Sequence, residues 1–133
     1  VRGLNLFLKL ALKRAILRPG GLDRDTRAGY LYPYDSWAHR VAIHRFIQDI
    51  PMSPSHPSQA YGTQTMGQLE KLVDKPMLLI WGLGDFVFTE AFLAQWQARF
   101  PKAETIRLSD AGHWIVEDAG IRLMPQIAGF LGD

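Results

Sequence analysis

The chain has 133 residues and no cysteine; 47% of its residues are hydrophobic and 21% are charged. This composition is typical of a globular domain, and it excludes disordered proteins, disulfide scaffolds, thiolate metal sites and cysteine nucleophiles. The net charge of +2 is uneven, because residues 1–50 carry 9 Lys and Arg against 4 Asp and Glu, whereas residues 51–133 carry 6 against 9.

No feature of the sequence predicts a membrane or a nucleic-acid partner. The longest apolar run, residues 76–84, is far shorter than the roughly 20 residues that cross a bilayer. No basic run is interleaved with aromatic residues, so we expect no nucleic-acid binding. We recognise no secretory or lipidation signal and expect a cytoplasmic protein. The first residue is Val1 rather than Met, so we also expect a piece of a longer protein.

The first half of the chain, residues 1–75, predicts helices joined by loops, with no strand. Apolar residues recur every three or four positions in residues 4–17, and basic residues fill the opposite face, which predicts an amphipathic helix. Such a helix packs on a protein core or lies on a membrane surface, and we favour packing. We expect a helical turn over residues 23–29 and an extended aromatic segment, stiffened by Pro33, over residues 30–34.

Two further helices are expected before residue 76. Asp35 or Ser36 can cap the first, which runs to about Gln48. A proline-rich loop follows, and the second helix covers about residues 63–73. The candidate buried positions of the first of these helices are Trp37, Val41, Ile43, His44 and Ile47.

The second half predicts a different architecture. Residues 77–81 form a short continuous apolar run, typical of a parallel strand that is buried on both faces. A helix over residues 88–100, a strand over 105–108 and a closing helix over 115–131 follow. This strand–helix–strand–helix order is typical of an α/β protein with a parallel sheet. Because two strands do not form a free-standing parallel sheet, we expect an incomplete domain.

Asp85 and His113 are the clearest candidates for catalytic residues. Asp85 follows the first predicted strand and His113 follows the second, 28 residues later. The carboxyl ends of neighbouring parallel strands lie side by side, so these residues are expected to hydrogen-bond. A carboxylate so placed fixes the tautomer of an imidazole and stabilises its protonated form, as the acid of a catalytic triad does.

Several segments carry a resemblance to a known family. They are WGLGDFVF (81–88), FLAQW (92–96) and DAGHWIVEDA (110–119). They resemble the C-terminal portion of α/β-hydrolase-fold enzymes, above all haloalkane dehalogenases, epoxide hydrolases and the β-lactone decarboxylases of bacterial olefin synthesis. Residues 30–46 resemble the end of the helical cap in that group. The resemblance implies that residues 1–75 belong to the cap domain and residues 76–133 to the hydrolase core.

The resemblance also implies residue roles. In those families the aspartate of W-G-x-x-D is the triad acid and the histidine of D-A-G-H is the base, and these positions are Asp85 and His113. The nucleophile belongs on a G-x-D-x-G or G-x-S-x-G elbow, which does not occur in these 133 residues. The H-G-x-P motif of the oxyanion hole is also absent. We therefore expect the remainder of the hydrolase core to supply both, and the chain alone to be inactive.

Several functions stay open. The leading hypothesis is a haloalkane dehalogenase-like hydrolase, in which an aspartate nucleophile forms an ester with an apolar substrate and His113 activates water to cleave it. A β-lactone decarboxylase would open a lactone ring with the same residues. A serine esterase or lipase, or an epoxide hydrolase, is a further alternative. A hypothesis of another class is a catalytically inert fragment or binding module. No cofactor or metal is expected.

Other residues have less specific interpretations. Phe86, Phe88 and Trp114 are candidate substrate-binding residues because they are apolar neighbours of the Asp–His pair. Cap tyrosines activate the epoxide in epoxide hydrolases, but cap packing is the preferred interpretation of the tyrosines of this chain. We also expect Trp37 to be structural, the Glu117–Asp118 pair to be solvated at a helix start, and His39, His44 and His56 to form no metal site. The tyrosines compared are Tyr30, Tyr32, Tyr34 and Tyr61.

Overall fold

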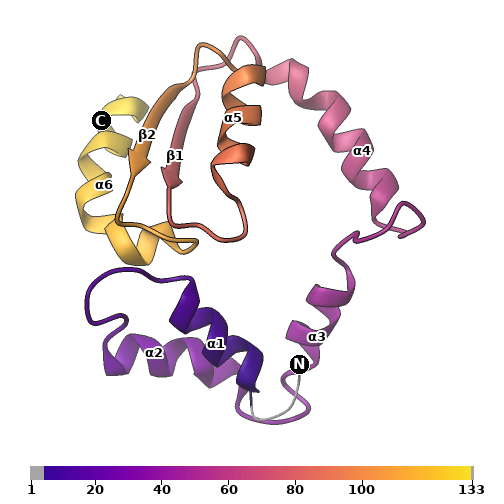
Figure 1. Cartoon of the computed structure of the whole chain (residues 1–133), viewed down its shortest axis with the longest axis vertical. Helices are drawn as coiled ribbons and strands as arrows, with labels where there is room; N and C mark the ends of the chain where they lie inside the picture. The colour runs from indigo at the N-terminus through magenta and orange to yellow at the C-terminus, as the bar shows by residue number, and fades with distance from the viewer. Residues whose placement is uncertain (1–4, 133) are drawn as a thin grey trace.

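The computed structural model describes residues 5–132, which form helices around one pair of strands (Figure 1). In chain order the elements are α1 (Leu6–Arg14), α2 (Arg24–Leu31), the 3-10 helix η2 (Tyr32–Tyr34), α3 (Val41–Gln48), α4 (Gln59–Gln68), the 3-10 helix η3 (Leu69–Leu72), β1 (Leu78–Gly82), α5 (Glu90–Arg99), β2 (Glu104–Leu108) and α6 (Ile115–Leu131).

The two strands form a parallel α/β unit, as the element order predicts. β1 pairs with β2 in a register that places Leu78 opposite Glu104 and Gly82 opposite Leu108. α5 connects them, and α5 and α6 flank the strands in Figure 1. The strands, the intervening helix and the closing helix lie where the sequence predicts them, and the α/β class is confirmed. The buried side chains of this part are Leu79, Leu93, Phe100, Ala111, Ala119 and Leu123.

β1 is less covered than its continuous apolar run predicts. Within β1 only Leu79 and Gly82 are buried, and its other residues are half-buried. Among the described residues β1 pairs with β2 alone. Its second edge and part of its faces are therefore available to further core elements.

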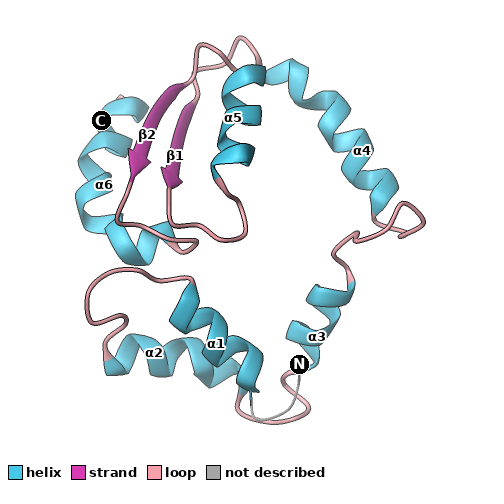
Figure 2. Cartoon of the chain, in the orientation of Figure 1, coloured by secondary structure: helices cyan, strands magenta, loops and turns pink. Residues whose placement is uncertain are grey.

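The first half of the chain is helical, as predicted, and forms an arc from α1 to α4 that returns to β1 (Figure 2). A small core joins the first two helices: Leu8, Leu12 and Ile16 pack together, and α2, the loop before it, η2, α3 and Trp114 contribute partly buried neighbours. By contrast, α2, α3 and α4 contain no fully buried residue. None of the helices within residues 5–132 combines the length and the apolarity that crossing a bilayer requires.

Several local expectations for the first half are wrong. Tyr30 lies in the last turn of α2, and residues 32–34 form η2 rather than an extended segment, because the fixed φ of Pro33 also fits the start of a helical turn. α3 begins at Val41 because Ser36 closes a turn of its own, accepting hydrogen bonds from the backbone N–H groups of His39 and Arg40.

Burial and helix limits differ as well. Of the five positions that we expect to be buried near α3, Trp37 and Val41 are exposed and the others are half-buried. α4 begins at Gln59, four residues before its expected start. α1 ends at Arg14, three residues early, and its expected start at Leu4 lies outside the described residues.

Candidate functional site

The site forms where β1 and β2 end on the same edge of the sheet. Asp85 lies three residues beyond β1, and His113 lies five residues beyond β2. Nδ1 of His113 is 2.9 Å from Oδ2 of Asp85, which confirms the predicted hydrogen bond between residues 28 positions apart. The Asp85 side chain is only 10% exposed and that of His113 is 27% exposed. The pair is thus shielded but still open to a ligand.

The carboxylate of Asp85 is fixed on both oxygens. Its Oδ1 accepts hydrogen bonds from the backbone N–H groups of Val87 at 2.7 Å and Phe88 at 2.9 Å, and its Oδ2 faces His113. The indole N–H of Trp81 donates to the Phe88 carbonyl at 2.8 Å and anchors the same turn. Because an ionised carboxylate only accepts hydrogen bonds, Nδ1 of His113 carries a proton, and Nε2 is the basic atom of the neutral ring.

Aromatic side chains flank the imidazole. The ring centroid of Phe88 lies 5.5 Å from that of His113, and the ring of Phe86 lies 6.2 Å from it. Phe92 of α5 meets Phe88 edge to face at 5.5 Å. The guanidinium carbon of Arg14, at the end of α1, lies over the ring of Phe86, 5.1 Å from its centroid. Phe86 and Phe88 are each 47% exposed, so they present an apolar surface beside His113.

Trp114, the third candidate substrate-binding residue, packs in a different place. Its ring lies 4.8 Å from the ring of Tyr30 at an angle of 31°. Its backbone N–H donates to the carbonyl of Ala15 at 3.0 Å. Trp114 therefore contributes to the packing between α6 and the first two helices.

Two glycines allow the loops of the site to approach one another. A Cβ on Gly82 would lie 2.5 Å from the carbonyl oxygen of Gly112, and a Cβ on Gly112 would lie 2.7 Å from the carbonyl oxygen of Ala15. Backbone atoms cannot yield to such contacts as a flexible side chain can. The end of β1, the loop before His113 and the end of α1 therefore pack backbone against backbone.

The interpretation of Glu117 and Asp118 as solvated carboxylates is wrong. Glu117 Oε1 accepts a hydrogen bond of 2.5 Å from the hydroxyl of Tyr30. Asp118 Oδ1 accepts from the backbone N–H groups of Leu17 and Arg18, both at 2.8 Å, and its Oδ2 accepts from that of Gly112 at 2.7 Å. Tyr30, Leu17 and Arg18 are about 90 and 100 residues away from these carboxylates, so no local pattern reveals their bonds.

The tyrosines compared with epoxide-activating residues do not gather at the Asp–His pair. The Tyr30 hydroxyl donates to Glu117, and this hydrogen bond raises the pKa of Tyr30 above its ordinary value. Tyr32 and Tyr61 are 81% and 74% exposed. The backbone carbonyl of Tyr34 accepts from Asn5. The packing interpretation holds for Tyr30 and Tyr34, which contact the core of Leu8, Leu12 and Ile16, and is wrong for the exposed Tyr32 and Tyr61.

Two of the other histidines, His39 and His56, have partners of their own. Nδ1 of His39 lies 2.7 Å from Asp35 on the surface, and the resulting hydrogen bond holds the pKa of Asp35 below its usual range. His56, which has no evident partner in the sequence, bonds to the carbonyl of Gln48 and to the backbone N–H of Ser58. No group of three or more ligands suited to a metal ion occurs within residues 5–132.

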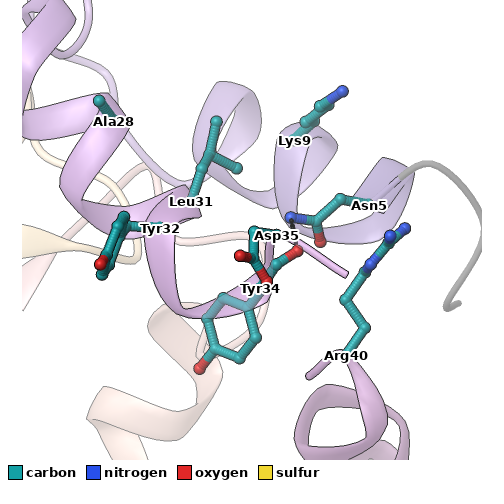
Figure 3. A pocket seen from close by; sticks show the side chains of 8 residues that line it. All are labelled: Asn5, Lys9, Ala28, Leu31, Tyr32, Tyr34, Asp35 and Arg40. Atoms are coloured by element: carbon teal, nitrogen blue, oxygen red, sulfur yellow. Dashed lines mark hydrogen bonds between the residues drawn. The ribbon is translucent and has the colours of Figure 1, made fainter. Parts of the chain in front are cut away.

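A separate hollow lies in the first half of the chain and has a volume of about 490 Å³ (Figure 3). It contains neither Asp85 nor His113, and it is open to solvent. Its charged side chains have opposite signs, since Lys9 and Arg40 are basic and Asp35 is acidic. It is lined by Asn5, Lys9, Ala28, Leu31, Tyr32, Tyr34, Asp35 and Arg40.

Comparison with known proteins agrees with this architecture. A family model described as the alpha/beta hydrolase fold matches residues 20–120, and the chain belongs to this family. The resemblance to the C-terminal portion of such enzymes is thereby confirmed.

Two curated relatives have the same descriptive name, cis-3-alkyl-4-alkyloxetan-2-one decarboxylase. The protein of Shewanella oneidensis is 35% identical over 131 residues, which cover 98% of this chain and 41% of the relative. The protein of Xanthomonas campestris pv. campestris is 37% identical over 105 residues, which cover 79% of this chain and 35% of the relative. The chain thus spans about two fifths of the length of the first relative and about a third of the length of the second.

Proposed function

We propose that these residues belong to a decarboxylase of oxetan-2-ones, that is, of β-lactones, in which His113 moves a proton and Asp85 orients it. The observation that carries the proposal is the 2.9 Å contact between Nδ1 of His113 and Asp85 in a chain similar to two proteins named as such decarboxylases. A haloalkane dehalogenase, the leading hypothesis from the sequence, has no counterpart among these two relatives.

The proposed reaction balances without water or an oxidant. The bond between the ring oxygen and C4 breaks, and so does the bond between C2 and C3. A double bond forms between C3 and C4, and C2 leaves with both oxygens as carbon dioxide. Opening of the ring places negative charge on an oxygen, and His113 acts there in its protonated form, which donates from Nε2 while Asp85 stabilises the charged imidazole through Nδ1. The nucleophile bonds to C4 as the ring opens and leaves C4 as the double bond forms, and the donated proton returns to Nε2 of His113 when carbon dioxide leaves.

The surroundings of His113 support an apolar substrate. Phe86 and Phe88 are half exposed beside the imidazole, and alkyl chains gain free energy when they leave water for such a surface. The nucleophile and the oxyanion hole would come from the remainder of the hydrolase core. The uncovered edge of β1 supports that arrangement, because a parallel strand needs a neighbour on each side to be buried.

A hydrolase is the second candidate, because the same geometry suits it. Nε2 of a neutral His113 held by Asp85 can take a proton from water, as the base of a catalytic triad does from its nucleophile. In that case an ester between substrate and nucleophile would be cleaved by water, as in haloalkane dehalogenases. The β-lactone would then yield a hydroxy acid and no carbon dioxide.

The products of one substrate separate the two candidates. The full-length protein, meaning the natural protein that contains these 133 residues, is incubated with a cis-3,4-dialkyl oxetan-2-one that carries ¹³C at C2. We expect labelled carbon dioxide and an alkene in equal amounts. Labelled hydroxy acid would instead support the hydrolase, and absence of any turnover would contradict both. A 1-haloalkane is tested in parallel, and release of halide from it would support a dehalogenase.

A further inference from the structure

We propose that Asp118 is a positioning residue for His113, because it ties the loop that carries the histidine to the segment that follows α1. The inference rests on the proposed catalytic role of His113. Asp118 lies in the first turn of α6 and does not contact the imidazole. It acts through Gly112, the residue immediately before His113. The backbone N–H of Gly112 donates a hydrogen bond of 2.7 Å to the Asp118 carboxylate.

The hydrogen bonds of Asp118 use both oxygens of the carboxylate. Oδ2 accepts from Gly112, whereas Oδ1 accepts from Leu17 and Arg18, both at 2.8 Å. All three donors are backbone N–H groups, and bonds from such groups to a charged oxygen are stronger than those between neutral groups. One side chain therefore fixes two stretches of backbone that lie about 100 residues apart in sequence.

Neighbouring contacts make this junction tight. The Trp114 N–H donates to the Ala15 carbonyl, and a Cβ on Gly112 would lie only 2.7 Å from the same carbonyl oxygen. In Figure 1 the end of α1 lies beside the start of α6. His113 thus lies between Gly112 and Trp114, and both of these neighbours are bonded across the junction. A shift of this backbone would move Nδ1 away from Asp85.

The substitution Asp118→Asn tests this role with little change in shape. An amide has one accepting oxygen, and its NH₂ group would face an N–H donor on one of the two sides. Either Gly112 or the pair Leu17 and Arg18 must therefore lose its acceptor. The matched control is Asp110→Asn on the same loop, because Asp110 is exposed and bonds to the exposed Arg122.

The first readout needs no substrate. In the full-length protein, the Nδ1 proton of His113 gives a downfield NMR signal while it is bonded to Asp85. We expect Asp118→Asn to broaden or shift this signal and to lose exchange protection at the amide of Gly112, or at those of Leu17 and Arg18. Asp110→Asn should leave all of these signals unchanged. A normal His113 signal in Asp118→Asn, with amide protection lost, would show a structural role only and overturn the inference.

The second readout is kinetic. With the lactone as substrate, we expect Asp118→Asn to lower kcat by about 10- to 100-fold and to leave KM within about twofold, because a misplaced imidazole impairs chemistry more than binding. An unchanged kcat would contradict the inference. If the wild-type protein does not turn over the lactone but the His113 signal still responds to Asp118→Asn, the proposed function fails and the positioning role stands.

A milder variant covers the case in which Asp118→Asn does not fold. Asp118→Glu keeps the charge and both acceptors but moves them by one methylene. We expect a smaller change of the same kind in the His113 signal and in kcat. A folded Asp118→Glu protein with wild-type values of both would overturn the inference.

Discussion

The phenolic hydroxyl of Tyr30 donates a 2.5 Å hydrogen bond to Oε1 of Glu117, which joins the end of α2 to the first turn of α6. The ring of Tyr30 also packs on Trp114, the residue after His113. This contact connects the helical first half of the chain to the loop that carries the histidine.

Removal of this hydroxyl has a predictable cost. We expect Tyr30→Phe to lower the free energy of unfolding by about 1 kcal/mol near neutral pH, because it leaves the ring packing intact but takes the donor from Glu117. Urea denaturation of the full-length protein measures the difference. An unchanged midpoint would show that the bond contributes no net stability.

The same bond predicts a pH dependence. The pKa of Tyr30 is raised above its ordinary value of 10.0, first by the hydrogen bond to Glu117 and then by burial. A raised pKa means that the fold favours the protonated phenol, so the stabilisation is complete below pH 10 and is lost as the pH rises through the pKa of the folded state. The stability difference between wild type and Tyr30→Phe should therefore vanish in strongly alkaline solution. A constant difference up to that pH would contradict the assignment.

The backbone approach at Gly82 predicts a contrast between two glycines. Gly82→Ala should destabilise the protein by about 1–3 kcal/mol, because its Cβ would meet the carbonyl oxygens of Ala111 and Gly112. Gly62 lies in α4 with no atom within 4 Å of an added Cβ, so Gly62→Ala should raise helix propensity and add about 0.5–1 kcal/mol. We expect the melting temperature of Gly82→Ala to lie below that of the wild type and the melting temperature of Gly62→Ala to lie above it. Equal tolerance of both changes would argue against the packed loops.

Asp85→Asn tests the acid of the pair. The amide keeps the size of the side chain but favours the wrong tautomer of His113 and cannot stabilise its charged form. We expect the kcat for lactone turnover to fall roughly 10³- to 10⁴-fold, the size of the effect that such a change has in serine proteases. Circular dichroism should show a folded protein. Activity within tenfold of wild type would exclude Asp85 as the orienting acid.

The second half of the fold and the Asp–His pair are predictable because local patterns determine them. The apolar run of β1 and the turn at Gly82–Asp85 are contiguous in sequence, and parallel pairing brings the strand ends together without further information. Asp85 and His113 could therefore be paired before any coordinates were known.

The first half is harder to predict because its signals are compatible with several conformations. Pro33 fits both an extended segment and the start of η2, and Ser36 closes its own turn instead of capping α3. Asp118 carries no local signal, since its donors are backbone groups that every residue except proline has. Only the folded chain shows which N–H groups lack another acceptor.

If His113 performs the proton transfer in lactone decarboxylation, its replacement should stop turnover, whereas replacement of a surface histidine should not. Release of carbon dioxide from a cis-3,4-dialkyl oxetan-2-one is measured for the full-length protein carrying His113→Gln or His39→Gln. His39 is a matched control, because its side chain is 63% exposed and pairs with Asp35 on the surface. We predict that His113→Gln loses roughly 10³-fold or more of kcat and that His39→Gln stays within about twofold of wild type. Equal rates for His113→Gln and His39→Gln would show that His113 does not perform the proton transfer.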